Sequence, residues 1–411
     1  MKKIFLVLLI TFLSFFTDSL TLYPFNLFRF DNILLQPYYT RPCQSELSIL
    51  TEVSANVKGR NPYGKKVNPL QIWNETQDAL TMIRGFPADS QIGQLAASLN
   101  SVNDDGVRGH FNVCGNYHMN DLAFAGRYYL PKGFFLDLFM PFYFMKLKYL
   151  EFDDLTQNIT NQDLLTHELL TDNIKSILKD FGCLNTSPWE QSGPGDLVLS
   201  VWWKYDFPQE KPWLKNVRVN LRGGATFPTG LKANLSDFGS IPFGLGSAGV
   251  FLGGDIEVTW GNCLKAGVDL QFLYLFGKNE TLRIATDENQ TDLFLLAVCE
   301  AQRNFGITQQ YLIYLQAIRF FRGMSFKWAY HYMLHQEDEL FLRSTTFSNT
   351  AANTAEYLQP WTIHSFILMM DYEWKNARES GPKLSLFWQQ PFNGRRSLQA
   401  VTFGVQFAYA F

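Results

Sequence analysis

The sequence has 411 residues, of which 46% are hydrophobic, 16% aromatic and only 18% charged. That charged fraction lies below the ~25% of typical soluble domains, and after the N-terminus no run of ~18 apolar residues occurs that would form a membrane-spanning helix. The net charge of -3 gives no reason to expect nucleic acid or anionic lipid as a partner. A chain rich in aromatic residues, poor in charge and without spanning helices is typical of a membrane β-barrel.

The N-terminus predicts an export signal. Lys2 and Lys3 precede an apolar core at 4–16, and small residues follow it. This order of basic, apolar and small residues is that of a signal peptide. We therefore expect a signal peptide at 1–19 and a periplasmic segment at 20–44, with an uncleaved membrane anchor as the alternative.

About twelve segments alternate between apolar residues and small or polar ones, with the period of two that puts successive side chains on opposite faces of a strand. In chain order the predicted strands are 46–58, 117–130, 134–147, 197–205, 217–228, 250–260, 264–276, 310–320, 324–336, 361–374, 383–390 and 398–411. A tilted strand needs ~9–11 residues to cross a bilayer, which these segments supply. An even number of strands returns both ends of the barrel to the same side of the membrane.

The links between these strands alternate between short and long. The short ones are 131–133, 208–216, 261–262, 321–323 and 375–382, and the long ones are 59–115, 150–195, 229–249, 277–309 and 337–360. Outer-membrane barrels have short periplasmic turns and long outer loops. The sequence thus predicts an all-β, antiparallel, up-and-down transmembrane barrel at 45–411 with long outer loops. The last outer link is short, and its dipeptide Asn393-Gly394 predicts a tight turn.

Two of the outer loops predict helices. Residues 162–181 carry apolar residues at roughly helical spacing and are followed by Gly182, which predicts a C-terminal cap. Residues 72–99 show a weaker helical pattern that is interrupted at 85–87. These helices form either a lid or plug over the mouth of the barrel, or a layer that packs on its rim.

The five cysteines are an odd number in a compartment that permits disulfides. Cys43 and Cys263 fall at the periplasmic end of the predicted barrel, whereas Cys114, Cys183 and Cys299 fall in or beside outer loops. We expect at most one bridge among the outer three, either Cys114–Cys183 or Cys183–Cys299. Five free thiols are the alternative.

The last predicted strand has large apolar residues on one face and small or polar ones on the other. Phe403 and Phe407 are expected to face lipid, and Gln406 the lumen. This ending resembles that of bacterial outer-membrane proteins, whose terminal aromatic strand is read by the barrel-assembly machinery. The resemblance implies that Tyr409 and Phe411 form the assembly signal, and that outer-membrane lipid and this machinery are partners.

The predicted inward faces carry charges of both signs. The candidate lumen-lining residues are Glu46, Glu52, Lys204, Arg218, Arg222, Asp255, Glu257, Lys265, Asp269, Lys327 and His331. Charge inside a barrel is stable only when water or an opposite charge compensates it, and Arg218 and Arg222 lie on the strand before the one with Asp255 and Glu257. Such a set forms either a constriction that selects a solute or a salt-bridge network that stiffens the barrel.

Motifs of known enzyme classes are missing from the sequence, including G-x-S-x-G, H-E-x-x-H, a Walker loop and cysteine pairs at zinc spacing. His331 and His335 share one face of a predicted strand but lie too far apart to bind one metal ion. We therefore expect no catalytic residue, no cofactor and no metal. The enzyme alternative is a membrane-embedded phospholipase, which would need a serine and a histidine together on the lipid-facing surface.

One stretch carries a family resemblance. Gly193-Pro194-Gly195-Asp196 opens a strand, residues 222–230 end in Pro-Thr-Gly, and Gly254-Asp255 follows a glycine-rich loop. These motifs resemble the outer-membrane transporter family linked to the meta-pathway of phenol degradation, which is related in style to long-chain fatty-acid transporters. The resemblance covers about residues 193–277, and it implies passage of small hydrophobic molecules across the outer membrane.

Together these features predict a channel or transporter of the cell outer membrane, through which small solutes, hydrophobic ones included, pass passively. The first alternative is a plugged barrel with a structural or surface-interaction role. The second is the lipid hydrolase.

Overall fold

The computed structural model describes residues 44–99, 108–157, 159–321, 323–374 and 381–411. The predicted signal peptide, most of the predicted periplasmic segment and Cys43 lie outside the described residues.

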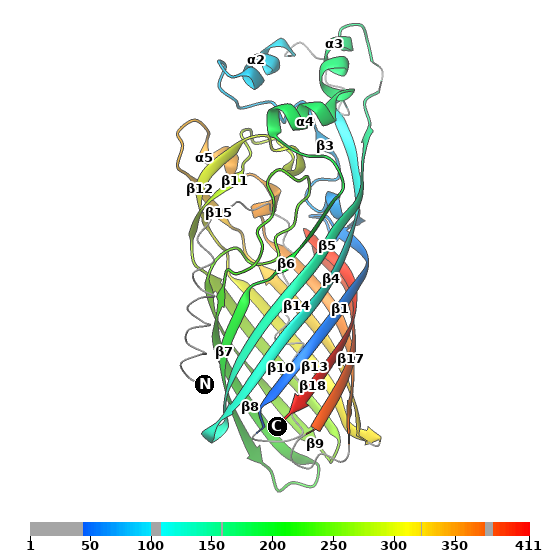
Figure 1. The fold of residues 1–411 in the computed structure, drawn as a ribbon, viewed down its shortest axis with the longest axis vertical. Helices are drawn as coiled ribbons and strands as arrows, with labels where there is room; N and C mark the ends of the chain where they lie inside the picture. The colour runs from blue at the N-terminus through cyan, green and yellow to red at the C-terminus, as the bar shows by residue number, and fades with distance from the viewer. Residues whose placement is uncertain (1–43, 100–107, 158, 322, 375–380) are drawn as a thin grey trace.

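The described chain forms a closed antiparallel barrel of twelve strands, which confirms the predicted fold (Figure 1). Its strands are β1 (Glu46–Arg60), β4 (His110–Leu130), β5 (Phe134–Asp154), β7 (Leu197–Pro208), β8 (Leu214–Phe227), β9 (Gly249–Trp260), β10 (Leu264–Leu275), β13 (Thr308–Phe321), β14 (Met324–His335), β16 (Trp361–Glu373), β17 (Gly381–Arg395) and β18 (Ser397–Ala410). Each strand pairs with the next, and β1 closes the barrel by pairing with β18 on one side and β4 on the other.

Along barrel strands such as β10 and β18, exposed apolar side chains alternate with buried and mostly small or polar ones. On β18, Phe403 is 55% exposed and Phe407 49%, whereas Gln406 between them is 2% exposed. The same pattern on β10 exposes Val268 and buries Asp269. The outward face of the barrel is therefore apolar and the inward face largely polar, as the period of two predicts.

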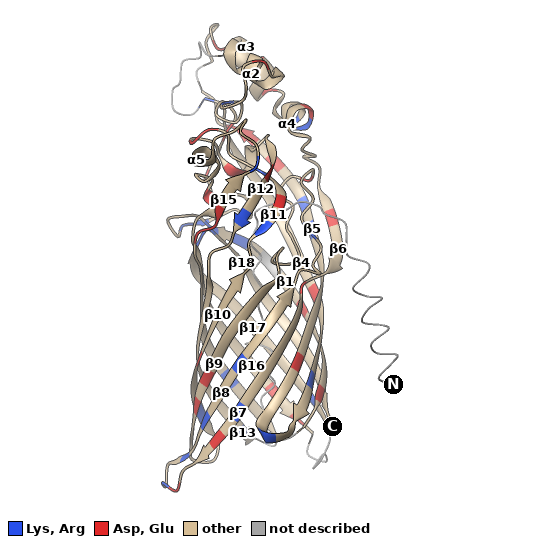
Figure 2. Ribbon diagram, turned by 90° about the vertical axis from the view of Figure 1, so that its left-hand side faces the viewer, with Lys and Arg blue, Asp and Glu red and all other residues tan. Residues whose placement is uncertain are grey.

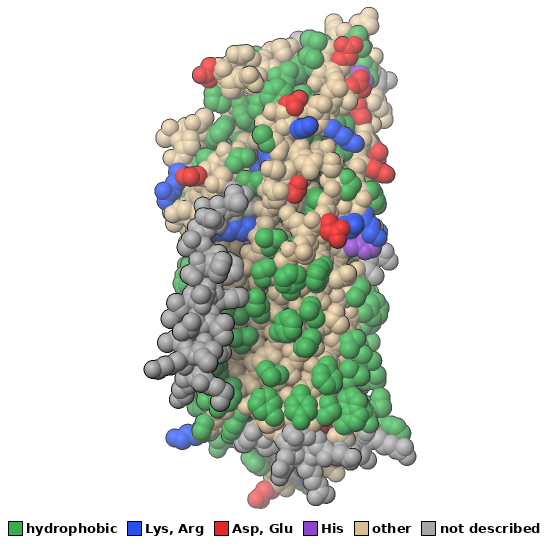
Figure 3. Space-filling view, in the orientation of Figure 1, with side chains coloured by type: hydrophobic (Ala, Val, Ile, Leu, Met, Phe, Trp, Pro, Cys, Tyr) green, Lys and Arg blue, Asp and Glu red, His purple; other side chains and the backbone are tan. Residues whose placement is uncertain are grey.

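The outer surface carries a broad apolar band (Figure 3). Toward the short turns it includes the contacting rings of Trp203, Tyr205 and Phe207. Toward the opposite end it includes the stacked pair Tyr311 and Tyr332. Aromatic residues at both edges of an apolar band are typical of a barrel in a bilayer. No helix of the described residues is long and apolar enough to span a membrane.

The described short links between β4 and β5, β7 and β8, and β9 and β10 lie at the end of the barrel where the C-terminus also lies, whereas the short turn between β17 and β18 lies at the opposite end (Figure 1). Between β4 and β5, Lys132 and Gly133 take φ values of 64° and 80° in the short helix η3 (Pro131–Gly133), so that the chain reverses within three residues. Phe411 follows β18 and exchanges two backbone hydrogen bonds with Ser45, at 3.0 and 2.9 Å. The strand pairing thus continues to the last residue.

The five long links fold together over the opposite end of the barrel, and we call this assembly the cap: residues 61–99, 159–196, 228–248, 276–307 and 336–360 (Figure 1). Its elements are β2 (Lys66–Val67), η2 (Pro69–Gln71), β3 (Gln77–Asp78), α2 (Gln91–Ser98), α3 (Leu164–Thr166), the π-helix η4 (His167–Thr171), α4 (Ile174–Gly182), β6 (Trp189–Pro194), β11 (Lys278–Arg283), η5 (Asp292–Phe294), β12 (Val298–Asn304), β15 (Glu339–Leu342), α5 (Asn349–Ala352) and η6 (Glu356–Leu358). Strands β11, β12 and β15 form a separate small sheet.

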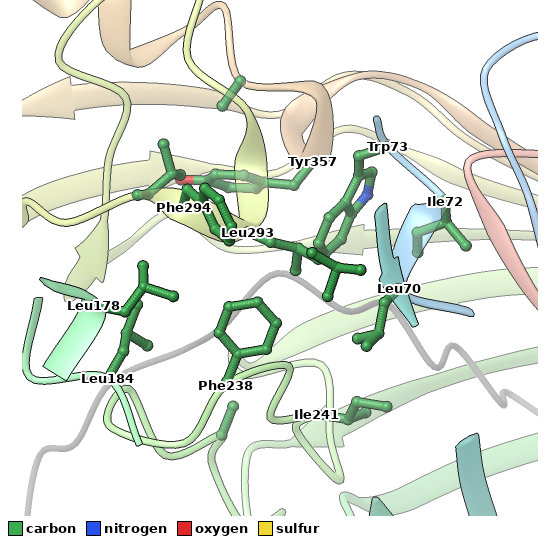
Figure 4. Packing of buried hydrophobic residues seen from close by; sticks show 14 of the residues in the cluster. Leu70, Ile72, Trp73, Leu178, Leu184, Phe238, Ile241, Leu293, Phe294 and Tyr357 are labelled. Carbon is green, nitrogen blue, oxygen red and sulfur yellow. The ribbon is translucent and has the colours of Figure 1, made fainter. Parts of the chain in front are cut away.

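The cap has a hydrophobic core that continues onto barrel strands such as β4 and β5, and each of the five links contributes to it. One buried side chain from each link is Leu70, Leu178, Phe238, Phe294 and Tyr357, and these residues lie close together in Figure 4. Since α4 supplies Leu178 to this core, the helix predicted in 162–181 packs as part of a folded layer.

Gly182 was predicted to cap a helix and Gly394 to form a turn, but both permit close packing instead. The residue with left-handed backbone after α4 is Cys183, at φ 52°, while Gly182 is still helical. A Cβ on Gly182 would lie 2.8 Å from Leu296, so the glycine permits close packing. Likewise β17 continues through Asn393-Gly394 to Arg395, and the turn falls at Arg396 (φ 48°). The predicted positions of the helix cap and of the turn were therefore wrong by one and two residues.

The helical prediction for 72–99 holds only for α2. Ile72, Trp73 and Met82 are buried in the cap core without forming a helix, because their apolar side chains serve packing between links. Cys114, Cys183, Cys263 and Cys299 are free thiols, so neither of the two candidate bridges forms.

Candidate functional site

The predicted lumen-lining residues lie on the inward faces of β1, β7, β8, β9, β10 and β14, and the charged positions of the barrel concentrate toward its short-turn end (Figure 2). Most of them are buried, namely Glu46, Glu52, Arg222, Asp255, Glu257, Lys265, Asp269 and His331. Lys204, Arg218 and Lys327 are half-buried. The interior of the barrel is thus largely filled by its own side chains.

Arg222 and Asp269 form an ion pair in which both side chains are almost completely buried. The guanidinium donates from Nη1 and Nη2 to the two carboxylate oxygens at 2.6 and 2.5 Å, and from Nε to Gln271 Oε1 at 2.7 Å. It also lies over the ring of Trp202, 4.8 Å from the ring centre. Because β9 separates β8 from β10, the arginine crosses Gly253, where a Cβ would lie 3.0 Å from Arg222 Nε.

Glu257 is the centre of a second group. Lys265 donates to its Oε1 at 2.5 Å, Arg218 donates to the same oxygen at 3.3 Å, and the hydroxyl of Tyr314 donates to Oε2 at 3.0 Å. Tyr314 comes from β13 and crosses Gly267 of β10, whose Cβ would lie 2.4 Å from the tyrosine ring. Lys327 Nζ lies 4.3 Å from the centre of the same ring. Glycines thus give long side chains room to reach across a strand.

Arg218 and Arg222 were expected to lie beside Asp255 and Glu257, and the observed partners differ for Arg222. Arg218 does bind Glu257, and it also donates to Asp206 at 2.8 Å. Asp255, however, accepts from the amide of Asn220 at 2.8 Å, while Arg222 extends to the next strand. Removing one partner of a buried ion pair such as Arg218–Glu257 would leave an uncompensated charge and so destabilise the folded barrel.

His331 does not belong to these ionic groups. It is paired in the sheet register with Ser365 of β16 and with Leu312 of β13. Neither of its ring nitrogens, nor Ser365 Oγ, has a hydrogen-bond partner among the described residues. Both side-chain amide atoms of the neighbouring Gln310 also lack a hydrogen-bond partner among the described residues. Sequence reasoning selected charged residues and missed Gln310 and Ser365, although both lie at inward positions of predicted strands.

Two of the three motifs that carry the family resemblance, Gly193-Pro194-Gly195-Asp196 and residues 222–230, meet at the cap end of the barrel, whereas Gly254-Asp255 lies within β9. Asp196 accepts from the backbone N–H groups of Gly230 and Leu245 at 2.9 and 2.5 Å. The hydroxyl of Thr229 donates to Gly195 O at 2.9 Å. Burial raises the pKa of Asp196 to about 6. The two motifs therefore hold the link between β8 and β9 against the start of β7.

A buried group joins the cap to the barrel. Asp338 accepts from Arg303 of β12 at 2.6 Å and from Gly306 N at 2.8 Å. His335, at the end of β14, lies 2.9 Å from the same carboxylate and 2.8 Å from Thr308 Oγ1. A hydroxyl, an imidazole and a carboxylate in sequence are the parts of a nucleophilic triad. Here the carboxylate of Asp338 also binds the guanidinium of Arg303, and all four side chains are buried. Since Arg303 belongs to the cap and His335 to a barrel strand, the group connects the cap to the barrel.

The outward surface bears one histidine–aromatic cluster. His364 Nδ1 lies 2.6 Å from the hydroxyl of Tyr330, beside Tyr332 and Phe392. The partner of this imidazole is thus a tyrosine hydroxyl, whereas the lipid-hydrolase alternative calls for a serine beside its histidine. The described residues likewise contain no group of three His, Cys, Asp or Glu that could hold a metal ion.

No protein-family model matches the sequence, and no curated protein is significantly similar to it. Among solved structures, the fold is similar to an outer-membrane channel from Pseudomonas putida F1, with a TM-score of 0.49 and 11% identity over 91% of this chain and 97% of that one. It is also similar to a FadL homologue of Pseudomonas aeruginosa (TM-score 0.28, 8% identity, 90% and 89% covered). A third match is the Pseudomonas putida toluene transporter TodX (TM-score 0.29, 7% identity, 90% of each chain). At these identities the likeness is one of fold alone.

Proposed function

We propose that this protein is a channel of the cell outer membrane through which small solutes, hydrophobic ones included, pass passively. The observation that carries the proposal is the opposite chemistry of the two barrel faces. The outward face presents exposed apolar residues such as Phe407, while the inward face presents polar ones such as Gln406 and Asp269. A surface of this kind is stable in lipid, and a polar interior offers hydrogen bonds to a solute.

The packing of the interior implies that passage is gated. The rings of Phe251 and Phe387 lie against Gly224 and Gly404 of neighbouring strands, where a Cβ would lie 2.4 and 2.0 Å from the nearest ring atom. These phenylalanines belong to an apolar cluster of inward residues drawn from many strands. A solute must therefore displace side chains of the interior, and it must enter past the cap.

The second candidate function is structural, with the barrel permanently closed. The observation in its favour is that inward charges such as Arg222 and Asp269 are buried and paired rather than exposed to a water-filled pore. The partners proposed for either function are outer-membrane lipid and the barrel-assembly machinery, with Tyr409 and Phe411 as the assembly signal. Both side chains are about half exposed on the outward face.

Liposome swelling tests the channel proposal. Purified protein is inserted into vesicles, which are then diluted into isotonic sugars, amino acids or aromatic acids. A channel gives swelling whose rate rises with the amount of protein and falls with solute size, and heat-denatured protein serves as the control. Equal rates for native and denatured protein with all three solute classes would favour the structural barrel.

A further inference from the structure

A row of uncharged polar side chains crosses the inward faces of four neighbouring strands. Gln271 of β10 lies directly opposite Gln310 of β13, and His331 of β14 lies directly opposite Ser365 of β16. Gln310 is paired with Met333, the inward position next to His331 on β14. We call these four residues the neutral row. None is more than 4% exposed.

The neutral row holds hydrogen-bonding capacity that the described protein does not use. The atoms without a partner are both ring nitrogens of His331, both amide atoms of Gln310, Ser365 Oγ and Gln271 Nε2. Large majorities of buried polar atoms in proteins have a partner, because leaving one unpaired costs its full desolvation. Six such atoms on four adjacent strands indicate a place where a guest molecule supplies the missing hydrogen bonds.

The guest is expected to be uncharged, because the charged groups beside the neutral row are already paired with one another. Arg222 is paired with Asp269 and with Gln271 Oε1, and Lys265 is paired with Glu257, so these charges are compensated. Within the neutral row itself the unused groups are uncharged: amide, imidazole and hydroxyl groups, which offer both donors and acceptors. An ion would bring an uncompensated charge into this buried place.

Apolar side chains surround the row and limit the size of the guest. Leu312, Ile367 and Met333 lie on the same inward faces and are themselves buried. Since the polar atoms of the row have almost no accessible surface, a guest enters only by displacing these flexible side chains.

We propose that the neutral row is the site along which small uncharged solutes with both donor and acceptor groups, such as polyols and simple amides, cross the barrel. This inference rests on the proposed channel function and names its substrate class. Glycerol and acetamide are suitable probes, because each is uncharged and carries both kinds of group.

The test compares glycerol and acetamide swelling rates of vesicles with wild type, Gln310→Leu, His331→Leu and the control Ile313→Leu, whose side chain lies on the outward face of β13. The first two variants keep a similar shape and remove hydrogen-bonding groups. We expect each to slow swelling about tenfold, the scale of losing one to two hydrogen bonds, and the control to match wild type. Wild-type rates in both variants would overturn the neutral row. If wild-type protein admits no solute, the channel proposal itself fails, and this inference fails with it.

A second readout does not depend on transport. The ring ¹⁵N signals of His331 are identified in labelled protein by their loss in His331→Leu. We expect glycerol and acetamide to shift these signals, and potassium chloride at equal osmolarity to leave them in place. No shift with either solute, together with a higher melting temperature of both leucine variants, would show a merely structural interior and would overturn the proposal.

Discussion

Arg222 on β8 and Asp269 on β10 form a buried two-fold ion pair although β9 lies between their strands. The guanidinium crosses β9 at Gly253, so the pair joins two strands that are not neighbours in the sheet. Bidentate arginine–carboxylate pairs are among the stronger hydrogen-bonded contacts in proteins. In this barrel the Arg222–Asp269 pair holds β8 and β10 in a defined arrangement.

A methyl group at Gly253 should disturb this crossing. In Gly253→Ala the new Cβ would lie 2.6 Å from the backbone oxygen of Leu270 and 3.0 Å from Arg222 Nε, so backbone and side chain must both shift. We expect a loss of about 1–3 kcal/mol in the free energy of unfolding, measured by urea denaturation in vesicles. Gly223→Ala is the matched control, because its Cβ would meet nothing closer than 3.7 Å. Equal stability of the two variants would contradict the crossing.

Breaking the ion pair should cost more than replacing it. Asp269→Asn leaves the buried guanidinium of Arg222 without its counter-charge, and we expect about 3–5 kcal/mol of destabilisation. The double variant Arg222→Met with Asp269→Leu removes both charges and should recover most of that loss. Urea denaturation of the single and double variants measures both effects. A double variant less stable than Asp269→Asn would show that the pair itself is strongly stabilising.

Arg283 should hold the cap together. Its guanidinium donates to the backbone oxygens of Gly182, Leu235, Leu295 and Leu296, which come from three different links. In Arg283→Met these buried carbonyls lose their donor, and each such loss costs about 1–3 kcal/mol. We expect faster proteolysis of the cap with the barrel intact. The exposed Arg343→Met is the control, and identical cleavage of both variants would exclude this role.

The joint between cap and barrel should be stable to moderate acid. Burial disfavours the charged form of Asp338, but the Arg303 guanidinium and His335 outweigh it and lower the pKa of Asp338 to about 2. Because this value lies below the ~3.9 of an exposed aspartate, the contribution to stability is complete above about pH 4 and is lost as the pH falls toward 2.

Pepsin digestion measures this window, since the enzyme cleaves in acid. We expect the cap to resist cleavage at pH 4 and to become sensitive near pH 2. Asp338→Asn removes the titrating group, so pepsin should cleave the cap of this variant already at pH 4. An unchanged pH profile in Asp338→Asn would show that another group controls the joint.

The barrel could be predicted from sequence because a strand in lipid must alternate, and residues such as Phe403 and Gln406 record that alternation locally. The cap could not, because its core joins side chains from five separate links, such as Leu70 and Phe294, and no local period reports such contacts. Gly182 and Gly394 look like a helix cap and a turn, yet they permit close approach to Leu296 and to Thr362 O.

The candidate site was predictable in part for the same reason. Charged residues such as Arg222 stand out in a charge-poor sequence, and alternation places them inside. Their partners depend on which strand a long side chain can reach, and this is decided by glycines such as Gly253 on the strand between. Gln310 and Ser365 carry no charge, so only the structure shows that they lie beside His331 without partners.

Single-channel recording in planar bilayers tests the central claim most directly. Wild-type protein should give discrete openings, and Arg283→Met, whose cap is loosened, should open more often. Bilayers that stay silent with both proteins, although each is inserted and folded, would contradict a channel and would assign the barrel a structural role.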